Sequence, residues 1–182
     1  MEKEILRLLN NLTEHNRDIQ YESYEELMKI VKEPVDWTYS VWEQFIKALT
    51  YKNAHVRTQA AQFLCALAAK SDPEERVLED FMKIWIVTYD EKIVTARHSL
   101  QSIWQIGLAG QVQRDLVVSH LAKRFHTCVD EKHPTLIRYD IIVSFKKLFD
   151  ATGDTKLVHI AQNLIEKEQD IKYQKKYKTA LR

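Results

Sequence analysis

The clearest helical pattern in the sequence lies in residues 53–71. Apolar residues follow Arg57 at three, seven and ten positions, as Ala60, Leu64 and Leu67. Because an α-helix has about 3.6 residues per turn, this spacing places all three on one face. We therefore predict an amphipathic helix here, with its apolar face packed against the rest of the protein.

The same pattern returns twice at intervals close to forty residues. Arg97 lies 40 residues after Arg57, and Arg138 lies 41 residues after Arg97. Apolar residues follow both at positions that correspond to those in the first helix. They are Leu100, Trp104, Ile141, Phe145 and Leu148. A helical pattern that recurs with such a period is typical of α-helical repeat proteins.

The other apolar stripes divide the chain into pairs of helices. The predicted pairs occupy residues 2–33, 36–70, 73–109 and 111–150, and a terminal helix occupies residues 155–182. Turns within the last three pairs are expected at residues 51–53, 89–91 and 129–131. We predict that residues 1–182 form a single all-α domain of about nine helices. The second helices should form the concave face of a right-handed superhelical solenoid.

The helix that contains Arg57 resembles the second helix of HEAT repeats. That helix carries a Val-Arg pair followed by an Ala-Ala-x-x-Leu face, and here the matching residues are Val56-Arg57 and Ala60-Ala61-x-x-Leu64. The resemblance implies an armadillo-like α-solenoid, a fold that serves as a scaffold for many functions. In such repeats the arginine commonly pairs with an acid or a carbonyl of the adjoining turn, which implies Asp90 and Asp130 as partners here.

Composition and charge exclude several classes of protein. The 182 residues include 27 basic and 26 acidic side chains, so net charge alone indicates neither nucleic acid nor an anionic membrane. Two cysteines are too few for a disulfide framework, and Cys65 lies on an apolar stripe. No apolar run approaches the roughly 20 residues of a membrane span, and the charged N-terminus has no signal-peptide core. We predict a soluble cytoplasmic protein without a membrane partner.

Four tryptophans raise the question of an aromatic binding pocket. Trp42, Trp85 and Trp104 fall on apolar stripes, which favours packing in the core. Trp37 follows Pro34 in a predicted loop, where we expect it to be partly exposed.

One family built on HEAT-like repeats, the AlkD-like alkylpurine DNA glycosylases, holds damaged bases with tryptophans and an aspartate. The repeat pattern gives this chain a distant resemblance to that family. However, the family's Trp-x-x-x-Asp spacing is missing, because Asp90 follows Trp85 at a different interval. The resemblance therefore implies no catalytic residue here, and we expect no glycosylase activity.

Metal and cofactor sites are not indicated. His120, His126, Cys128 and His133 lie near one another, but their spacing does not give paired ligands on one face for tetrahedral zinc. No glycine-rich phosphate loop or nucleophile elbow occurs. We predict no metal, no cofactor and no small-molecule substrate.

Candidate binding residues lie beside the repeated arginines. If Arg57, Arg97 and Arg138 stand in register on neighbouring helices, they form either a structural ladder or a basic ridge for an acidic partner or phosphates. Polar residues near them extend the predicted binding face. These are Gln62, His98 and Tyr139.

The C-terminal segment is the most basic part of the chain. From Ile171 onward it has five basic residues, including Lys175 and Lys176, and no acidic ones. It is either a solvated last helix or an arm that contacts nucleic acid or an acidic protein. Our prediction for the whole chain is a non-enzymatic scaffold or adaptor that binds a protein partner. The alternative is a nucleic-acid-binding or DNA-repair protein.

Overall fold

The computed structural model describes residues 3–182, and within this range it contains helices and no β-strand. The all-α prediction is confirmed, whereas the predicted helix start at Glu2 lies outside the described residues. The α-helices in this range are α1 Lys3–Asn11, α2 Arg17–Ile30, α3 Thr38–Ala48, α4 Ala54–Lys70, α5 Arg76–Ile86, α6 Ile93–Leu100, α7 Gln111–Thr127, α8 Pro134–Thr152, α9 Thr155–Glu166 and α10 Ile171–Ala180. The 3₁₀ helices are η1 Val87–Tyr89, η2 Ile103–Leu108 and η3 Cys128–Asp130.

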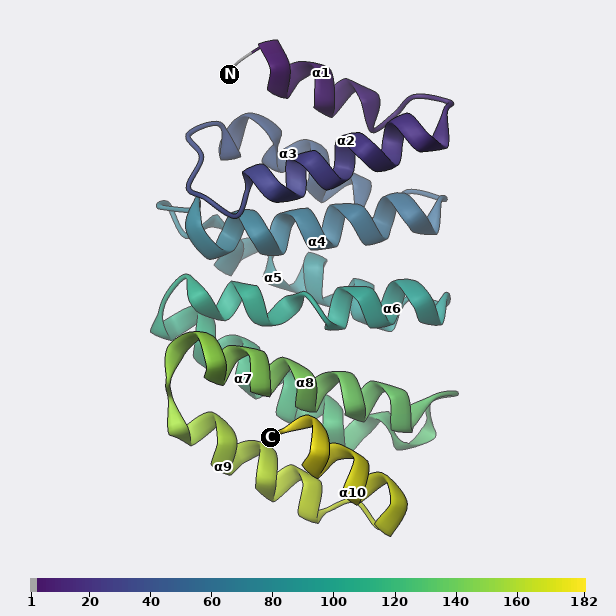
Figure 1. Ribbon diagram of the computed structural model, residues 1–182, viewed down its shortest axis with the longest axis vertical. Helices are drawn as coiled ribbons and strands as arrows, with labels where there is room; N and C mark the ends of the chain where they lie inside the picture. Colours follow the sequence, from purple (N-terminus) through teal and green to yellow (C-terminus); the bar gives the residue numbers. More distant parts are fainter. Residues whose placement is uncertain (1–2) are drawn as a thin grey trace.

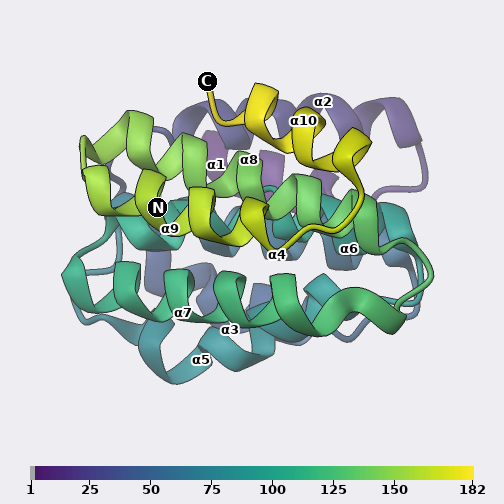
Figure 2. The ribbon, with the colours of Figure 1, turned by 90° about the horizontal axis from the view of Figure 1, so that it is seen from below.

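Most of the helices lie in two layers (Figures 1 and 2). The second-helix layer consists of α2, α4, α6 with η2, and α8, each in contact with the next. Behind it lie α3, α5 and α7, the first helices of the pairs. At the C-terminal end, α9 and α10 both pack on α8. The order of the pairs in space therefore follows their order in the sequence.

The predicted turns lie between α-helices. Residues 51–53 join α3 to α4, and the other two turns lie where η1 and η3 end. Asn53 ends the first turn as the cap of α4, because its side chain accepts a hydrogen bond from the main-chain N–H of His55 at 2.9 Å.

The apolar faces predicted from the repeat form the core. Ala60, Leu64 and Leu67 of α4 are buried, as are Phe145 and Leu148 of α8. They belong to one contiguous cluster with residues from every described α-helix. Apolar burial of this kind is the main force that holds adjacent helix pairs together. No helix within residues 3–182 is long and apolar enough to cross a membrane.

The environment predicted for Trp37 is wrong, and that predicted for Trp104 is only partly right, because Trp104 packs against the core but is not buried in it. Trp37 is buried and stacks on Phe63, with ring centroids 6.4 Å apart. Trp104 is partly exposed, because the helix expected to continue to residue 108 breaks after α6 and resumes as η2. A 3₁₀ helix turns each residue by about 120°, so the stripe predicted from α-helical spacing does not carry through. Trp42 and Trp85 are buried, as predicted.

Gly107 lets η2 pack closely on α8. A Cβ atom at this position would lie 3.1 Å from a methyl carbon of Leu148. Contacts this short require the neighbour to move. Gly107 lies ten residues after Arg97, where the helix of Arg57 has Leu67, and its missing side chain permits this close helix contact.

The predicted terminal helix is two helices. The chain leaves α9 after Glu166 and begins α10 at Ile171, where the Asp170 carboxylate accepts from the Lys172 N–H at 2.8 Å. Tyr177 of α10 is fully buried, and its hydroxyl donates to the Thr135 carbonyl at 3.0 Å. The C-terminal segment is therefore docked on α8 rather than frayed.

Candidate functional site

The three repeated arginines, here called the arginine ladder, all contact acids of the next structural unit. Arg57 Nε and Nη2 donate to the two carboxylate oxygens of Asp90 at 2.6 and 2.9 Å. Its Nη1 donates to the main-chain carbonyls of Tyr51 and Lys52 at 2.6 and 3.0 Å. The prediction that Asp90 pairs with the ladder is confirmed.

Asp90 is stabilised as a carboxylate by these contacts. Burial alone would raise its pKa, but hydrogen bonds from Arg57 and from the main-chain N–H of Lys92 outweigh that effect and lower the pKa. Asp90 lies just before α6, whereas Arg57 lies on α4. The pair therefore joins two consecutive helices of the second-helix layer.

Arg97 has a different partner from the one predicted. Its Nε and Nη2 donate to Asp140 at 2.7 and 3.0 Å, and Gln101 Nε2 donates to the same carboxylate at 2.8 Å. Asp130, the predicted partner, is exposed at the end of η3. The reason is that α8 brings Asp140 against α6, whereas Asp130 lies in the turn that precedes α8.

Arg138 completes the ladder at the C-terminal end. Its Nη1 donates to Glu168 at 2.8 Å, and its Nε donates to the Phe125 carbonyl at 3.0 Å. Its guanidinium carbon lies 4.8 Å from the centroid of the Phe125 ring. Because every ladder arginine has an acidic partner, the contacts favour a structural ladder over a basic ridge.

The polar residues predicted beside the ladder do not form one cluster. Gln62 on α4 accepts a hydrogen bond from the Tyr24 hydroxyl at 2.6 Å. His98 on α6 is exposed, and Tyr139 on α8 is partly exposed. The three side chains are spread over the successive helices of the second-helix layer.

A basic surface lies on α10. Its exposed lysines are Lys172, Lys175, Lys176 and Lys178. The Lys176 ammonium lies 4.8 Å from the centroid of the Tyr139 ring, in cation–π geometry. No acidic residue occurs between Ile171 and Ala180. These lysines therefore form a basic surface at the C-terminal end, beside Arg138, the last arginine of the ladder.

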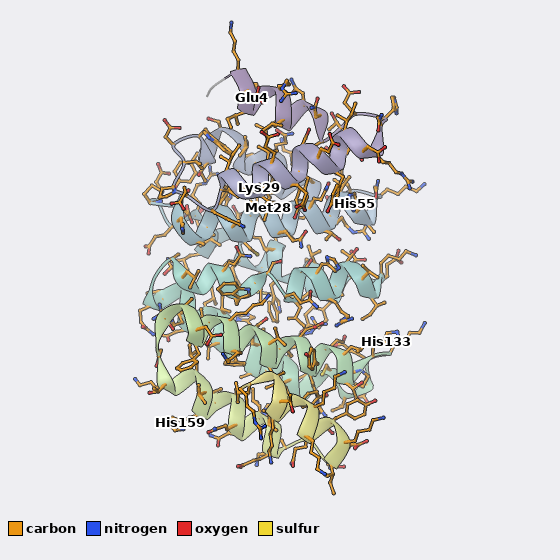
Figure 3. All side chains as sticks on the ribbon, viewed as in Figure 1. Glu4, Met28, Lys29, His55, His133 and His159 are labelled. Atoms are coloured by element: carbon orange, nitrogen blue, oxygen red, sulfur yellow. The ribbon has the colours of Figure 1, made fainter. Side chains whose placement is uncertain are left out.

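A groove of about 550 Å³ crosses the second-helix layer. Apolar residues from α2, α4 and η2 line this Trp104 groove, and they are Met28, Val31, Ala66, Ala69, Trp104 and Leu108. Lys32, Lys70 and Glu33 also line it, and Figure 3 shows Lys29 next to Met28 on α2. Lysines therefore outnumber acids around an apolar floor.

Trp104 gives the groove its one buried donor without a partner. Its indole Nε1 is buried and has no hydrogen-bond partner in the part of the chain that the structure describes. The sequence analysis did not predict this groove, because its apolar lining residues have the pattern of core residues. The two small alanines of α4 are the only sequence signal, since small side chains leave space between neighbouring helices.

The histidines and cysteine considered for a metal site are not arranged for one. Within residues 3–182, no group of three or more His, Cys, Asp or Glu side chains is placed to hold a metal ion. His120 Nδ1 instead lies 2.8 Å from the Leu116 carbonyl, and its ring packs edge-on against Phe81 and Trp85. His120 therefore belongs to the packing between α5 and α7.

Comparison with known proteins informs the fold alone. No protein-family model matches the chain, and no curated protein matches it. Two similar solved structures are crystal structures of engineered proteins, each 15% identical in sequence with a TM-score of 0.52. The alignments cover 98% and 99% of this chain, but 47% of the first engineered chain and 96% of the second. This chain thus spans about half the length of the first, and the likeness supports an all-helical fold.

Proposed function

We propose that the protein is a non-enzymatic α-solenoid scaffold of the HEAT type that binds a protein partner on its second-helix layer. The observation that carries this proposal is the Trp104 groove. Three successive helices contribute to its apolar floor, so it suits an elongated ligand better than a compact one. Helical grooves of this kind receive the apolar face of an amphipathic segment.

The groove's charge and polarity define the partner further. Lys32 and Lys70 lie among its lining residues, so acidic residues should flank the apolar anchors of the partner. The partly exposed Trp104 side chain lines the groove and can contact the bound segment, and tryptophan is enriched at the centres of protein interfaces. The partner is therefore an acidic amphipathic segment.

The test places a negative charge in the groove. Ala69→Glu introduces an acid among the lining residues, and Val112→Glu is its matched control because Val112 is exposed on α7 in the other layer. The full-length proteins are immobilised and exposed to cell extract with and without nuclease. Captured proteins are then compared by mass spectrometry.

The proposal expects a nuclease-resistant protein captured by the wild type and by Val112→Glu but not by Ala69→Glu. The captured protein should also slow amide hydrogen exchange in α2, α4 and η2. Equal capture by Ala69→Glu and the wild type, or exchange protection confined to other helices, contradicts the groove as the binding site.

A second candidate function, nucleic-acid binding, is favoured by the basic surface of α10. Its four exposed lysines have the charge needed for phosphate contacts. The ladder arginines would add little, because acids already pair with them. A nucleic acid should therefore contact the C-terminal end and leave the Trp104 groove uncovered.

A further inference from the structure

A notch between the first two helix pairs has the composition of a second binding site. Its volume is about 380 Å³, and it is lined by residues of the turn between α1 and α2, of α2, α3 and α4, and of the turn between α3 and α4. Phe45, Ala48 and Ala60 supply buried apolar walls. None of the residues that line this Gln59 notch lines the Trp104 groove.

Gln59 is the group in the notch whose bonding is incomplete. Its side chain lines the notch although the residue is only 7% exposed. Its Nε2 is buried and has no hydrogen-bond partner among residues 3–182. An unpaired buried donor destabilises the folded state, whereas a ligand oxygen at that position would satisfy it.

We propose that the Gln59 notch binds a peptide segment of a protein partner. A leucine-sized apolar side chain occupies part of the notch against Phe45, Ala48 and Ala60. The Gln59 amide turns toward the ligand, and a main-chain carbonyl of the same segment accepts a hydrogen bond from its Nε2. The proposal rests on the proposed function only in taking the ligand to be a protein, and it assigns a different surface.

The lining of the notch explains why a peptide is the ligand. The buried walls carry no charge, so they suit an apolar side chain. Gln44 also lines the notch, and its amide side chain matches the donor and acceptor of a main-chain peptide group. Gln20 lines it as well, and because its Nε2 donates to the Glu14 carbonyl, its Oε1 is the atom left for a ligand N–H. Glu14 and Arg17 are exposed lining residues of opposite charge, so the mouth favours neither an acidic nor a basic ligand.

The first test uses capped amino acids as probes of the full-length protein. N-acetyl-leucine N-methylamide and its alanine analogue are titrated separately while the side-chain amide signals of Gln59 are followed by ¹⁵N NMR. The leucine probe should shift these signals and bind at least about tenfold more tightly, since its extra carbons are buried. Equal affinities for the two probes overturn the proposal.

The second test removes the donor and keeps the shape. Gln59→Met should weaken binding of the leucine probe by about two- to tenfold. It should also raise the Tm, because an unpaired buried amide is lost. Gln162→Met is the matched control and should bind the probe as the wild type does, since Gln162 is exposed on α9 and does not line the notch. Unchanged affinity in Gln59→Met contradicts the assigned hydrogen bond, and a lowered Tm indicates a structural role for Gln59 instead.

The third test separates a peptide from a small amide. Acetyl-Gly-Gly-Leu-Gly-Gly-amide should bind more tightly than the capped leucine, because its flanking peptide groups reach Gln20 and Gln44. No gain in affinity means that the notch takes small amides, which overturns the peptide assignment. Ala69→Glu should not alter either titration. If no protein is captured from extract but the leucine probe still binds, only the proposal for the Trp104 groove is rejected. If a protein is captured but the probe does not bind, only the proposal for the notch is rejected.

Discussion

Arg97 and Arg124 both belong to the region where the third and fourth helix pairs meet, but their charges are held differently. The Arg97 side chain is 30% exposed and donates two hydrogen bonds to Asp140, whose side chain is 1% exposed. The guanidinium can therefore keep part of its contact with water while it satisfies a buried carboxylate. This is the arrangement in which a buried acid is stabilised most effectively.

Arg124 on α7 is almost completely buried, and its two hydrogen bonds go to two different groups rather than to one carboxylate. The residue is 1% exposed, and its two terminal nitrogens donate to Thr88 at 2.6 Å and to Glu131 at 3.1 Å. Its guanidinium carbon lies 3.6 Å from the centroid of the Tyr89 ring, and its buried Nε has no partner within residues 3–182. Burial lowers the pKa of Arg124, while the charge of Glu131 opposes that shift.

The difference shows which polar contacts hold the helix pairs together. In the ladder, removal of one partner leaves the other without its bonds, so each pair depends on both members. The hydrogen bonds of Arg124 do not fully offset the free energy of desolvating its guanidinium. Replacing Arg124 by an uncharged residue therefore removes part of that unfavourable free energy. The following predictions test this contrast in order of decreasing effect.

Asp140→Ala should be the most destabilising of these changes. It removes the partner of Arg97 and the acceptor of Gln101, so we expect a loss of roughly 2–4 kcal/mol in the free energy of unfolding. Urea denaturation measures the loss. The control is Asp150→Ala, which breaks an exposed pair with Lys146 and should change stability by about 0–1 kcal/mol. Equal losses in the two variants would show that burial of the ladder has no special role.

Acid should weaken the Arg57–Asp90 contact selectively. The folded-state pKa of Asp90 is lowered, so the unfolded state binds the proton more readily and stability falls with falling pH. This contribution is complete above the unfolded pKa of about 3.9 and is lost as pH falls through the folded value. Asp90→Asn should therefore be less stable near pH 6 and show a shallower loss below pH 5. Parallel stability–pH curves for the two proteins would contradict the assignment.

Arg124→Met should change stability much less than Asp140→Ala, by about 1 kcal/mol or less in either direction. Thr88 also donates to the Trp85 carbonyl at 2.7 Å, and Glu131 is partly exposed, so neither group is left isolated. Thermal unfolding of both variants gives the comparison. A loss from Arg124→Met as large as that from Asp140→Ala would mean that its stacking on Tyr89 outweighs desolvation.

The arginines also show which contacts can be predicted from the sequence. The partner Asp90 of Arg57 could be predicted, because the resemblance to HEAT repeats implies that the repeated arginine pairs with an acid of the adjoining turn. Asp140 could not be identified as the partner of Arg97, since only the packing of α8 on α6 brings them together. Arg124 lies outside the repeated pattern, and its position in the sequence predicts an exposed residue of an amphipathic helix.

Both candidate binding surfaces depend on three-dimensional details that periodicity does not encode. Trp104 is partly exposed because the helix changes to 3₁₀ geometry at η2. No single residue in the sequence predicts that change. Gln59 falls near the apolar face of α4, where a polar side chain is ordinary. Its unpaired donor can be recognised only when the turn between α1 and α2, α2 and α3 are packed around it.

The smallest effect on stability is expected for the lysines of α10. Their charges are exposed to water, unlike those of Asp140 and Arg124. Replacement of Lys172, Lys175, Lys176 and Lys178 by Gln should change the free energy of unfolding by about 0.5 kcal/mol or less per site. Capture of a protein in the Trp104 groove should be unaffected, because that groove is lined by α2, α4 and η2.

The same lysine variant separates the two candidate functions. If α10 binds nucleic acid, the wild type should bind an oligonucleotide with a salt dependence of roughly 0.7–0.9 in log K per log salt for each phosphate contact. The lysine variant should then lose that binding, while Asp140→Ala, measured where it remains folded, should retain it. Binding that instead weakens when Arg57, Arg97 and Arg138 are replaced in folded variants would contradict the ladder, because paired arginines have little charge to offer a phosphate. With no measurable binding at physiological salt, the basic surface has no such role, and the groove is left as the site that defines the function.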